Sequence, residues 1–358
     1  MTTAPARQNR FTHLLATRPW LLADGATGSN LFDVGLMSGD APELWNFEHP
    51  DRIANLHRSF VGAGADIILT NSFGGTRYRL KLHKAEDQVA EINLAAARIA
   101  RAVADASGRE VAVAGSMGPT GEIMEPIGPL TFDQARDAFA EQAKSLAEGG
   151  ADVLWIETMS SAEEVQAAVA GAATAGLPIV CTLSFDTNGR TMMGISPSDF
   201  AALEKTLIPR LAACGTNCGV GASEVVACIH NLAEATGPDV VLVAKGNCGI
   251  PQYVDGSIVY NGTPEIMAVY ARMALDAGAR IIGGCCGTSA KHLRAMRGAL
   301  DAHTAAASPE LDAIVSALGD VSTGARAQWG GEQSRLGGAA AGANLKRGRG
   351  RRSGAAAE

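Results

Sequence analysis

Short apolar runs alternate with amphipathic stretches along most of the chain. We expect eight strands, at residues 20–23, 66–71, 111–115, 153–158, 178–185, a sixth ending at 218, 240–244 and 280–282. The helices expected after these strands span residues 51–63, 86–106, 133–147, 162–175, 201–207, 224–235, 264–277 and 290–303. Near-continuous apolar strands that alternate with helices are typical of a parallel sheet covered by helices. Eight such units favour a closed (β/α)8 TIM barrel over an open doubly wound sheet.

The pattern divides the chain into one barrel and its flanks. Residues 1–18 are polar and form an N-terminal lead-in, and residues 19–304 form the barrel. An extra helix is predicted at 305–320, because Ser308-Pro309-Glu310 supplies a capping serine, a proline at the first helical position and an acid in the first turn. Residues 321–358 are rich in Gly and Ala and end in a basic run, so we expect a disordered tail. The helix at 311–318 and Trp329 could form an arm between subunits of a homo-oligomer.

Composition narrows the class of protein. The 358 residues are 47% hydrophobic with a net charge of −7, and this mild, mixed charge argues against nucleic acid or membrane as a partner. No apolar run approaches the roughly 20 residues that span a bilayer, and no signal-peptide pattern opens the chain. Seven cysteines, an odd number, fit a reducing compartment, so we expect a cytoplasmic protein. RNA binding by the Arg-Gly end is an alternative that would make the barrel incidental.

The stretch Arg280-Ile281-Ile282-Gly283-Gly284-Cys285-Cys286-Gly287-Thr288 carries the most specific chemistry. Adjacent cysteines rarely bridge each other without strain, whereas the three glycines permit a sharp turn that brings both thiols to one ion. A third thiol, Cys218, ends another apolar run. Three thiolates with one open position describe a zinc site that takes a substrate as its fourth ligand. We therefore predict zinc on Cys218, Cys285 and Cys286, while Cys248 stays unassigned and the other cysteines are interpreted as core residues.

Two carboxylates stand at predicted strand ends, where the catalytic residues of barrels lie. Glu157 closes an apolar strand, and burying its charge is costly unless it is paired. Asp24 follows Leu21-Leu22-Ala23, although Asp-Gly is also an ordinary turn sequence. Zinc lowers the pKa of a bound thiol, and carboxylates hold an ammonium group. A zinc site beside two carboxylates therefore favours alkyl transfer to a substrate that carries both a thiol and an ammonium group. Other polar residues at strand ends are Asn71, Ser116, Asp186, Lys245 and Asn247.

Six motifs, in order, resemble those of the zinc-dependent homocysteine S-methyltransferases, most closely the bacterial betaine–homocysteine methyltransferases. They are Asp24-Gly25-Ala26-Thr27-Gly28, Thr70-Asn71-Ser72-Phe73, Gly115-Ser116-Met117-Gly118-Pro119-Thr120-Gly121, Trp155-Ile156-Glu157-Thr158, Gly215-Thr216-Asn217-Cys218 and Gly283-Gly284-Cys285-Cys286-Gly287-Thr288. The resemblance covers roughly residues 18 to 300 and implies a (β/α)8 barrel with zinc on the three cysteines. It further implies that Asp24 and Glu157 bind the homocysteine amino group, with Gly25 in the same substrate site and Asn217 beside the metal.

One position departs from the resemblance. Animal betaine enzymes have a tyrosine after the Thr-Phe of the second strand end, whereas Gly74 follows Phe73 here. A quaternary ammonium donor needs aromatic faces around its cation. Trp45, Phe73 and Tyr78 are the candidates, and simple packing of a loop is the alternative for Trp45.

The resulting prediction is methyl transfer from a small onium donor, with betaine favoured, to homocysteine, which gives methionine. Alternatives within the class are S-methylmethionine or another sulfonium donor, or a homocysteine module methylated from a cobalamin protein. No cobalamin or folate domain is visible in this chain, which favours a freely diffusing donor. An alternative of another class is a non-catalytic zinc- or thiol-binding protein, which the presence of both Asp24 and Glu157 disfavours.

Overall fold

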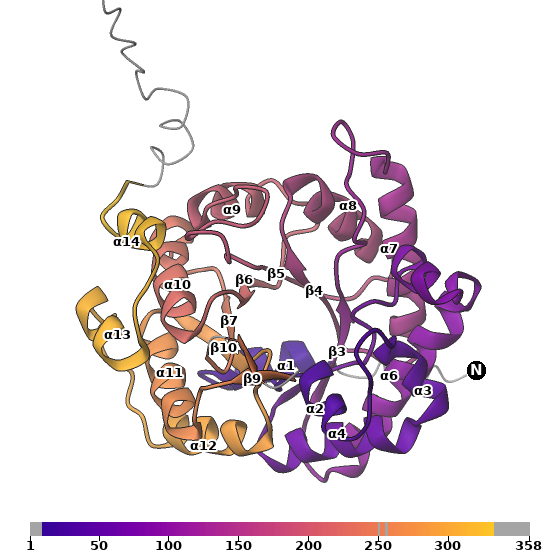
Figure 1. Ribbon diagram of the computed structural model, residues 1–358, viewed down its shortest axis with the longest axis horizontal. Coiled ribbons are helices and arrows are strands. Elements are labelled where there is room, and N and C mark those ends of the chain that lie inside the picture. The colour runs from indigo at the N-terminus through magenta and orange to yellow at the C-terminus, as the bar shows by residue number, and fades with distance from the viewer. Residues whose placement is uncertain (1–8, 250, 255–256, 333–358) are drawn as a thin grey trace, which may run out of the picture.

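The central element is a ring of eight parallel strands. The computed structural model describes residues 9–249, 251–254 and 257–332. The strand order is β1-β10-β7-β6-β5-β4-β3-β2, and a bridge between Ala23 and Ile67 joins its two ends. The strands are β1 (Leu21–Leu22), β2 (Ile67–Leu69), β3 (Ala112–Met117), β4 (Val153–Met159), β5 (Ile179–Leu183), β6 (Ala213–Cys218), β7 (Leu242–Gly246) and β10 (Ala279–Gly284). Helices surround the ring (Figure 1), so the (β/α)8 barrel prediction is confirmed.

One long helix follows each strand on the outside of the ring. These helices are α4 (Pro50–Gly62), α6 (Val89–Ala106), α7 (Phe132–Glu148), α8 (Ala162–Ala173), α9 (Pro197–Glu204), α10 (Ala222–Thr236), α11 (Pro264–Asp276) and α12 (Ala290–Asp301). Short helices occupy the loops before α4 and α6: α2 (Gly28–Phe32), η1 (Pro42–Leu44), α3 (Trp45–Glu48), α5 (Arg77–Leu80), η2 (Lys81–His83) and η3 (Glu86–Gln88). Only α9 departs clearly from its predicted range. It begins earlier because Ser196 and Asp199 form a capping box around Pro197.

Tight turns return the chain from helix to strand. Gly64, Gly150 and Gly278 have φ of 104°, 100° and 110°, in the left-handed region that favours glycine. The aspartates after two of these turns support the neighbouring strand. The Asp66 carboxylate accepts a hydrogen bond from the Leu22 backbone N–H, and the Asp152 carboxylate accepts one from that of Val113.

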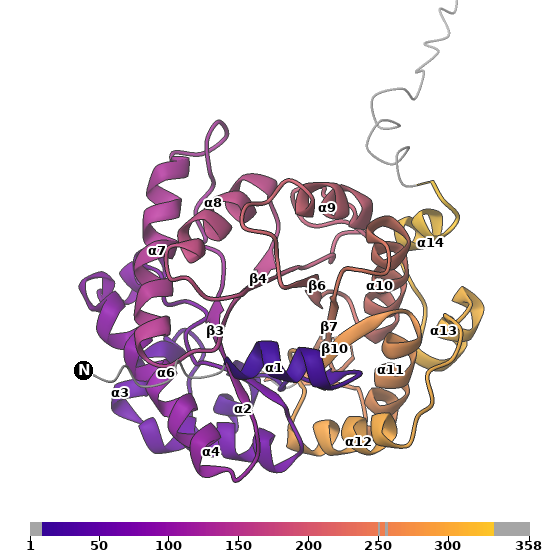
Figure 2. The ribbon, with the colours of Figure 1, turned by 180° about the vertical axis from the view of Figure 1, so that it is seen from behind.

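The lead-in predicted at residues 1–18 contains a helix that is not expected from the sequence, α1 (Arg10–Thr17). Its Phe11 and Leu14 are fully buried against the inward-facing side chains of the strands. Figure 2 shows α1 lying across the opening of the barrel on the side away from the viewer of Figure 1. The Arg280 guanidinium donates to the carbonyls of Leu15 and Arg18 and ties the end of α1 to β10.

The helical part of the C-terminal extension is longer than predicted. Helix α13 (Leu311–Leu318) confirms the extra helix, but a second helix, α14 (Thr323–Trp329), follows where disorder is predicted from residue 321. Both helices contact α10, and the Trp329 indole stacks on the His230 ring of the same chain at 3.8 Å. Trp329 therefore packs within its own chain. The predicted disorder of residues 333–358 lies outside the described residues.

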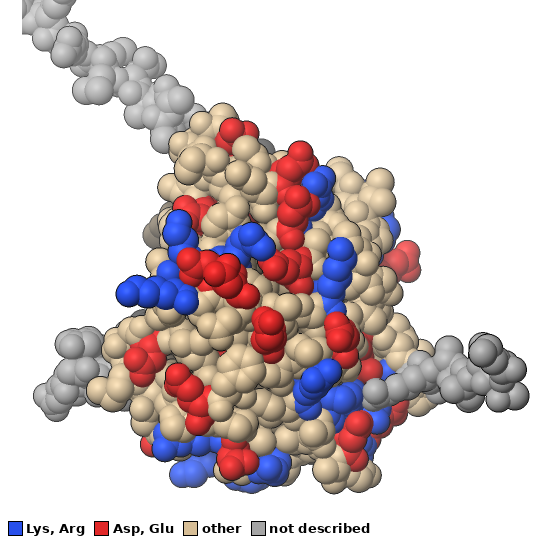
Figure 3. Space-filling model, turned by 90° about the vertical axis from the view of Figure 1, so that its right-hand side faces the viewer, with Lys and Arg blue, Asp and Glu red and all other residues tan. Residues whose placement is uncertain are grey.

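An antiparallel hairpin, β8 (Pro251–Val254) and β9 (Ser257–Tyr260), interrupts the loop after β7 and is absent from the sequence prediction. Within the described residues, no helix is long and apolar enough to cross a membrane. The face drawn in Figure 3 carries acidic and basic side chains intermixed. The cytoplasmic location stays a prediction.

Candidate functional site

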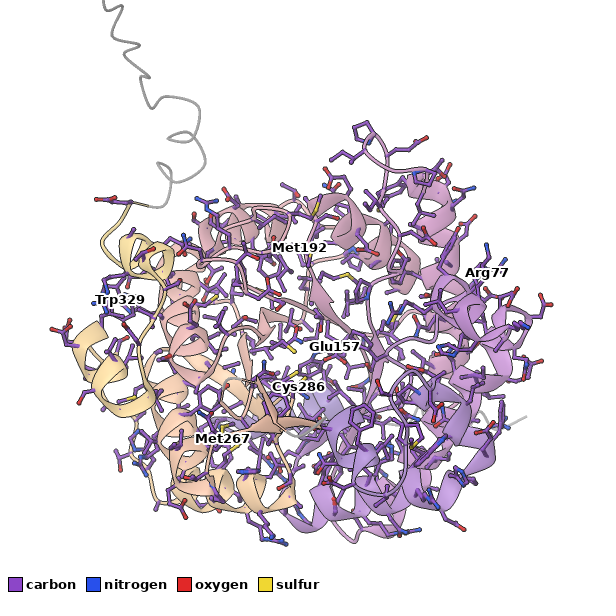
Figure 4. All side chains as sticks on the ribbon, in the orientation of Figure 1. Arg77, Glu157, Met192, Met267, Cys286 and Trp329 are labelled. Carbon is purple, nitrogen blue, oxygen red and sulfur yellow. The ribbon has the colours of Figure 1, made fainter. Side chains whose placement is uncertain are left out.

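A cavity of about 970 Å³ opens at the carboxyl ends of the strands. Its walls come from the last residues of strands β2, β3, β4, β6, β7 and β10 and from the segments that follow β1, β2 and β10, together with Tyr260. Figure 4 shows Glu157 and Cys286 close to the centre of the ring, whereas Trp329, Arg77 and Met267 lie toward its periphery. The carboxyl end of the strands is where barrel enzymes hold their reacting groups.

Three thiols meet at one wall of this cavity. The Cys218 sulfur lies 3.0 Å from that of Cys285 and 3.8 Å from that of Cys286, and all three atoms lie within 4.8 Å of one another. Within the described residues this is the one group of three or more Cys, His, Asp or Glu side chains close enough to hold a metal ion. The sequence thus identified the three residues that the fold brings together.

The backbone holds the two cysteine loops in register. Cys218 has a φ of 61°, an uncommon conformation for a non-glycine residue, which turns the chain at the end of β6. The Asn247 side chain joins the loops: its oxygen accepts from the Cys286 N–H, and its amide donates to the Gly219 carbonyl. Asn247 is thus a positioning residue for the thiol cluster.

The cluster fits a zinc ion. Neighbouring thiols and burial raise the pKa of Cys218 well above its usual value, so the three groups do not ionise together without a cation. Tetrahedral zinc with bonds of about 2.3 Å places its sulfur ligands roughly 3.8 Å apart. The Cys218–Cys286 separation matches that spacing, and the Cys218–Cys285 pair is tighter. Three thiolates from two loops also leave a fourth position open.

Beside the thiols lies a buried ion pair. The Lys245 ammonium donates to Asp24 at 2.7 Å, and the two side chains are 2% and 1% exposed. The second Asp24 oxygen accepts from the Leu69 N–H at 2.7 Å. Burial raises the pKa of Asp24, which Lys245 partly offsets; burial lowers that of Lys245, but Asp24 and Glu157 raise it above its usual value. Both oxygens of Asp24 are thus engaged by the protein itself.

Glu157 is held differently. One of its oxygens accepts a hydrogen bond from the Ser116 hydroxyl at 2.5 Å, and the side chain lines the cavity. Burial raises the pKa of Glu157 to about 7, against the opposing pull of Lys245. Glu157 is therefore a buried carboxyl group that faces the cavity with acceptor capacity to spare.

The remaining predicted substrate residues divide into two groups. Gly25 and Phe73 line the cavity, as Glu157 does. A side chain at position 25 would place its Cβ 2.5 Å from the Thr288 carbonyl, so only glycine fits there. Asp24, Asn217 and Trp45 do not line the cavity.

Asn217 and Trp45 have partners that explain their burial. The Asn217 oxygen accepts from the Thr158 N–H and the Thr182 hydroxyl, and its amide donates to the Thr158 hydroxyl. Asn217 therefore fixes Thr158, the residue after Glu157 in β4, beside the thiol cluster. Trp45 is 4% exposed and packs edge-on against His49 with the Arg52 guanidinium over its ring, which supports the packing alternative.

Position 74 is glycine because Glu43 fills the adjacent space. The Gly74 N–H donates to a Glu43 oxygen at 2.6 Å, and a Cβ at residue 74 would lie 2.9 Å from that oxygen. A different aromatic residue reaches the thiol cluster. Tyr260, at the end of β9, lines the cavity, hydrogen-bonds Cys286 and packs over Gly287.

Sequence reasoning therefore missed Tyr260 and the roles of Lys245 and Asn247. The strand-end positions of Lys245 and Asn247 were a usable signal, since polar side chains after an apolar strand point toward the mouth of a barrel. No periodic signal marked Tyr260, which follows a short hairpin inside a loop.

The comparisons with known proteins identify the family. A family model described as homocysteine S-methyltransferase matches residues 21–300. The chain belongs to this family. The members of this family are S-methyltransferases that act on homocysteine, which confirms the family expected from the motifs.

Relatives of known sequence or structure agree with membership of the homocysteine S-methyltransferase family. The chain is 29% identical to the methionine synthases of Mycobacterium leprae and Mycobacterium tuberculosis, with 84% and 78% of this chain aligned. The chain spans about a quarter of the length of these two proteins, since the alignments cover 26% and 24% of them. The homocysteine methyltransferase MmuM from Escherichia coli, in its oxidized form, matches with a TM-score of 0.68 and 25% identity, covering 81% of this chain and 99% of MmuM.

Proposed function

We propose that the protein transfers a methyl group from a small onium donor, with betaine favoured, to homocysteine and forms methionine. The observation that carries this proposal is that three thiols and the Glu157 carboxyl group line the same cavity. Zinc held by Cys218, Cys285 and Cys286 would lower the pKa of the substrate thiol and keep it ionised near neutral pH. A crystal structure of E. coli MmuM is of a metallated form, which supports a metal in this family.

The residues of this chain orient the thiol substrate. Glu157 accepts hydrogen bonds from the homocysteine ammonium through the oxygen that Ser116 leaves free. Asn217 and Asn247 keep the three thiols and the end of β4 that carries Glu157 in fixed relation. The substrate sulfur then attacks the methyl carbon in line. A sulfur–carbon bond forms, the carbon–nitrogen bond of the donor breaks, and its electron pair stays on nitrogen. When betaine is the donor, the leaving group is therefore dimethylglycine with a neutral amine nitrogen.

The cavity also carries groups suited to the donor. Phe32, Phe73 and Tyr260 line it and offer aromatic faces to a methylated cation. Arg79 and His83 line it too and can bind a carboxylate. Betaine combines an onium group with a carboxylate, so these residues offer a partner to each of its charges, and the motifs resemble those of betaine enzymes. S-methylmethionine combines the same two groups with an additional ammonium and is the alternative donor.

The test is methionine formation by the purified, zinc-loaded protein. Homocysteine is supplied with betaine, S-methylmethionine or methylcobalamin in separate reactions, and methionine is quantified by mass spectrometry. Turnover with betaine alone is the expected result, and turnover with S-methylmethionine alone would replace the donor. Because the related methionine synthases are far longer than this chain, methylation only from methylcobalamin would favour a module that receives its methyl group from a partner. No turnover with any donor despite bound zinc would favour the non-catalytic alternative.

A further inference from the structure

The Lys245 ammonium group is a buried charge at the carboxyl end of the barrel. Its side chain is only 2% exposed, yet it lines the cavity. It projects from the end of β7, and its register partner on β10, Gly283, has no side chain to come between Lys245 and the first strand. The ammonium lies 5.7 Å from the centre of the Trp155 ring, which is part of the barrel interior below the cavity.

The ion pair with Asp24 uses only part of the hydrogen-bonding capacity of the Lys245 ammonium. An ammonium has three hydrogen-bond donors, and among the described residues the hydrogen bond from Lys245 is to one Asp24 oxygen. Trp155 offers the ammonium a ring face but no lone pair. A buried donor without an acceptor is costly, so the remaining N–H groups call for an acceptor from the cavity.

The charged groups around the cavity match those of an amino acid: the Lys245 ammonium suits a carboxylate, and the Glu157 carboxyl group suits an ammonium. Asp24 and Lys245 balance one another, and Glu157 adds a carboxyl group that faces the same cavity and ionises when an ammonium binds beside it. Lys245 and Glu157 are near enough for each to influence the pKa of the other. An α-amino acid carries its ammonium and carboxylate on one carbon atom, so it presents both charges to neighbouring groups.

We propose that Lys245 determines specificity for an α-amino acid thiol by donating hydrogen bonds to the substrate carboxylate while Glu157 receives the ammonium. This inference deepens the proposed function and rests on it for the identity of the thiol substrate. In this arrangement Asp24 is a positioning residue that holds the Lys245 ammonium, and it does not itself contact the substrate. The competing interpretation makes Lys245 only a counterion for Asp24.

A substrate without the carboxylate separates these two roles. The probe is 3-aminopropane-1-thiol, which is homocysteine without its carboxylate, and kcat/KM is compared with that for homocysteine at saturating donor. Loss of a charge-assisted hydrogen bond in a buried site corresponds to on the order of 100-fold. The native enzyme should therefore prefer homocysteine by about this factor.

The double variant keeps the charge balance of the site, whereas its single-substitution control removes the counterion of Lys245. Lys245→Met combined with Asp24→Asn removes the pair without leaving a bare charge buried, and Asp24→Asn alone is the matched control that keeps the ammonium. The double variant should lose about 100-fold in kcat/KM for homocysteine and little for the aminothiol, whereas Asp24→Asn alone loses rate with both substrates but retains part of the preference for homocysteine. Lys245→Arg, which keeps a positive charge beside Asp24, should keep part of the preference for homocysteine over the aminothiol. Equal losses for both substrates in the double variant would overturn the proposal and leave Lys245 a counterion.

A binding measurement on the native protein needs no variant and no turnover. Calorimetry compares L-methionine with its decarboxylated amine, 3-(methylsulfanyl)propan-1-amine. Preference for methionine of on the order of 100-fold supports the carboxylate site even if no donor gives turnover, an outcome that would reject only the proposed methyl transfer. Equal affinities would overturn the role of Lys245 even in an enzyme that makes methionine from betaine.

Discussion

The two ends of the barrel each bury an aspartate, and the surroundings of these residues differ. At the amino end of the strands, Asp66 is completely buried and accepts from the Leu22 N–H and from the guanidinium groups of Arg18, Arg109 and Arg297. At the carboxyl end, Asp24 accepts from the Leu69 N–H and from one ammonium. Both carboxylates thus support a neighbouring strand through one backbone N–H.

The difference lies in what the partners leave unused. The three arginines around Asp66 keep 27% to 36% of their side chains exposed, so their remaining donors are accessible to water. Lys245 and Glu157 are buried, and their remaining donors and acceptors face a cavity. A completed ion-pair network at one end stabilises the fold, whereas incomplete pairing at the other leaves capacity for a substrate.

The largest effect is expected from the thiol cluster at the carboxyl end. Cys286→Ala should abolish stoichiometric zinc binding and reduce methionine formation by more than about 1000-fold, because two thiolates no longer define a three-ligand site. Metal content by mass spectrometry and turnover are measured on the same sample. Cys248→Ala is the matched control, since this buried thiol bonds the Gly262 carbonyl outside the cluster. Full zinc content and normal turnover in Cys286→Ala would refute the assignment.

At the amino end a single substitution should cost stability and little else. Asp66→Asn leaves three partly exposed guanidinium groups around a neutral amide, and losing their charge-assisted hydrogen bonds should cost about 2–3 kcal/mol. Chemical denaturation measures the free energy of unfolding, and kcat is measured on the protein that remains folded. A large loss of kcat with unchanged stability would reverse the contrast between the two ends.

The Glu157 carboxylate should destabilise the metal-free protein at neutral pH, because it is buried and its charged partner is the substrate ammonium. Its pKa rises from 4.5 to about 7 on folding, so the native state binds more protons than the unfolded state between these values. Stability therefore falls as pH rises from about 4.5 through 7, by about 3 kcal/mol in all. Glu157→Gln should remove this slope and be more stable than the native protein at pH 8, but not at pH 4, in denaturation curves.

The same substitution should weaken the substrate site. Without the carboxylate, kcat/KM for homocysteine should fall by about 100-fold, mostly through KM, because the ammonium loses its charged partner. A native-like KM combined with the stability gain would show that the Glu157 charge serves no substrate ammonium.

The features that sequence could predict are those encoded locally. Eight apolar strands and the adjacent Cys285 and Cys286 are contiguous signals, and Cys218 stands at a strand end that any parallel barrel brings to the same rim. The barrel and the residues of the thiol cluster were therefore available before the structure. Helix α1 was not, since it is short and its two buried residues are separated by polar ones.

The pairing inside the site depends on distant contacts. Lys245 and Asp24 are 221 residues apart, and nothing in either strand specifies which of two carboxylates takes the ammonium. The burial of Trp45 likewise follows from His49 and Arg52 packing around it, and the exclusion of a side chain at Gly74 follows from the rotamer of Glu43. Such choices are made by packing in three dimensions, where pattern alone carries no information.

The smallest expected effect concerns Tyr260, which approaches the thiol cluster from the β8–β9 hairpin. Tyr260→Phe keeps the aromatic face in the cavity and removes only the hydroxyl that bonds Cys286. Partners of metal ligands typically contribute 10- to 100-fold in affinity, so zinc affinity should fall by about 10-fold while the KM for the donor stays unchanged. Competition with a chelator measures the affinity, and Tyr78→Phe, outside the cavity, is the matched control. If donor KM rises while zinc affinity is unchanged, the hydroxyl serves the donor, and the incomplete pairing at this end extends to the second substrate.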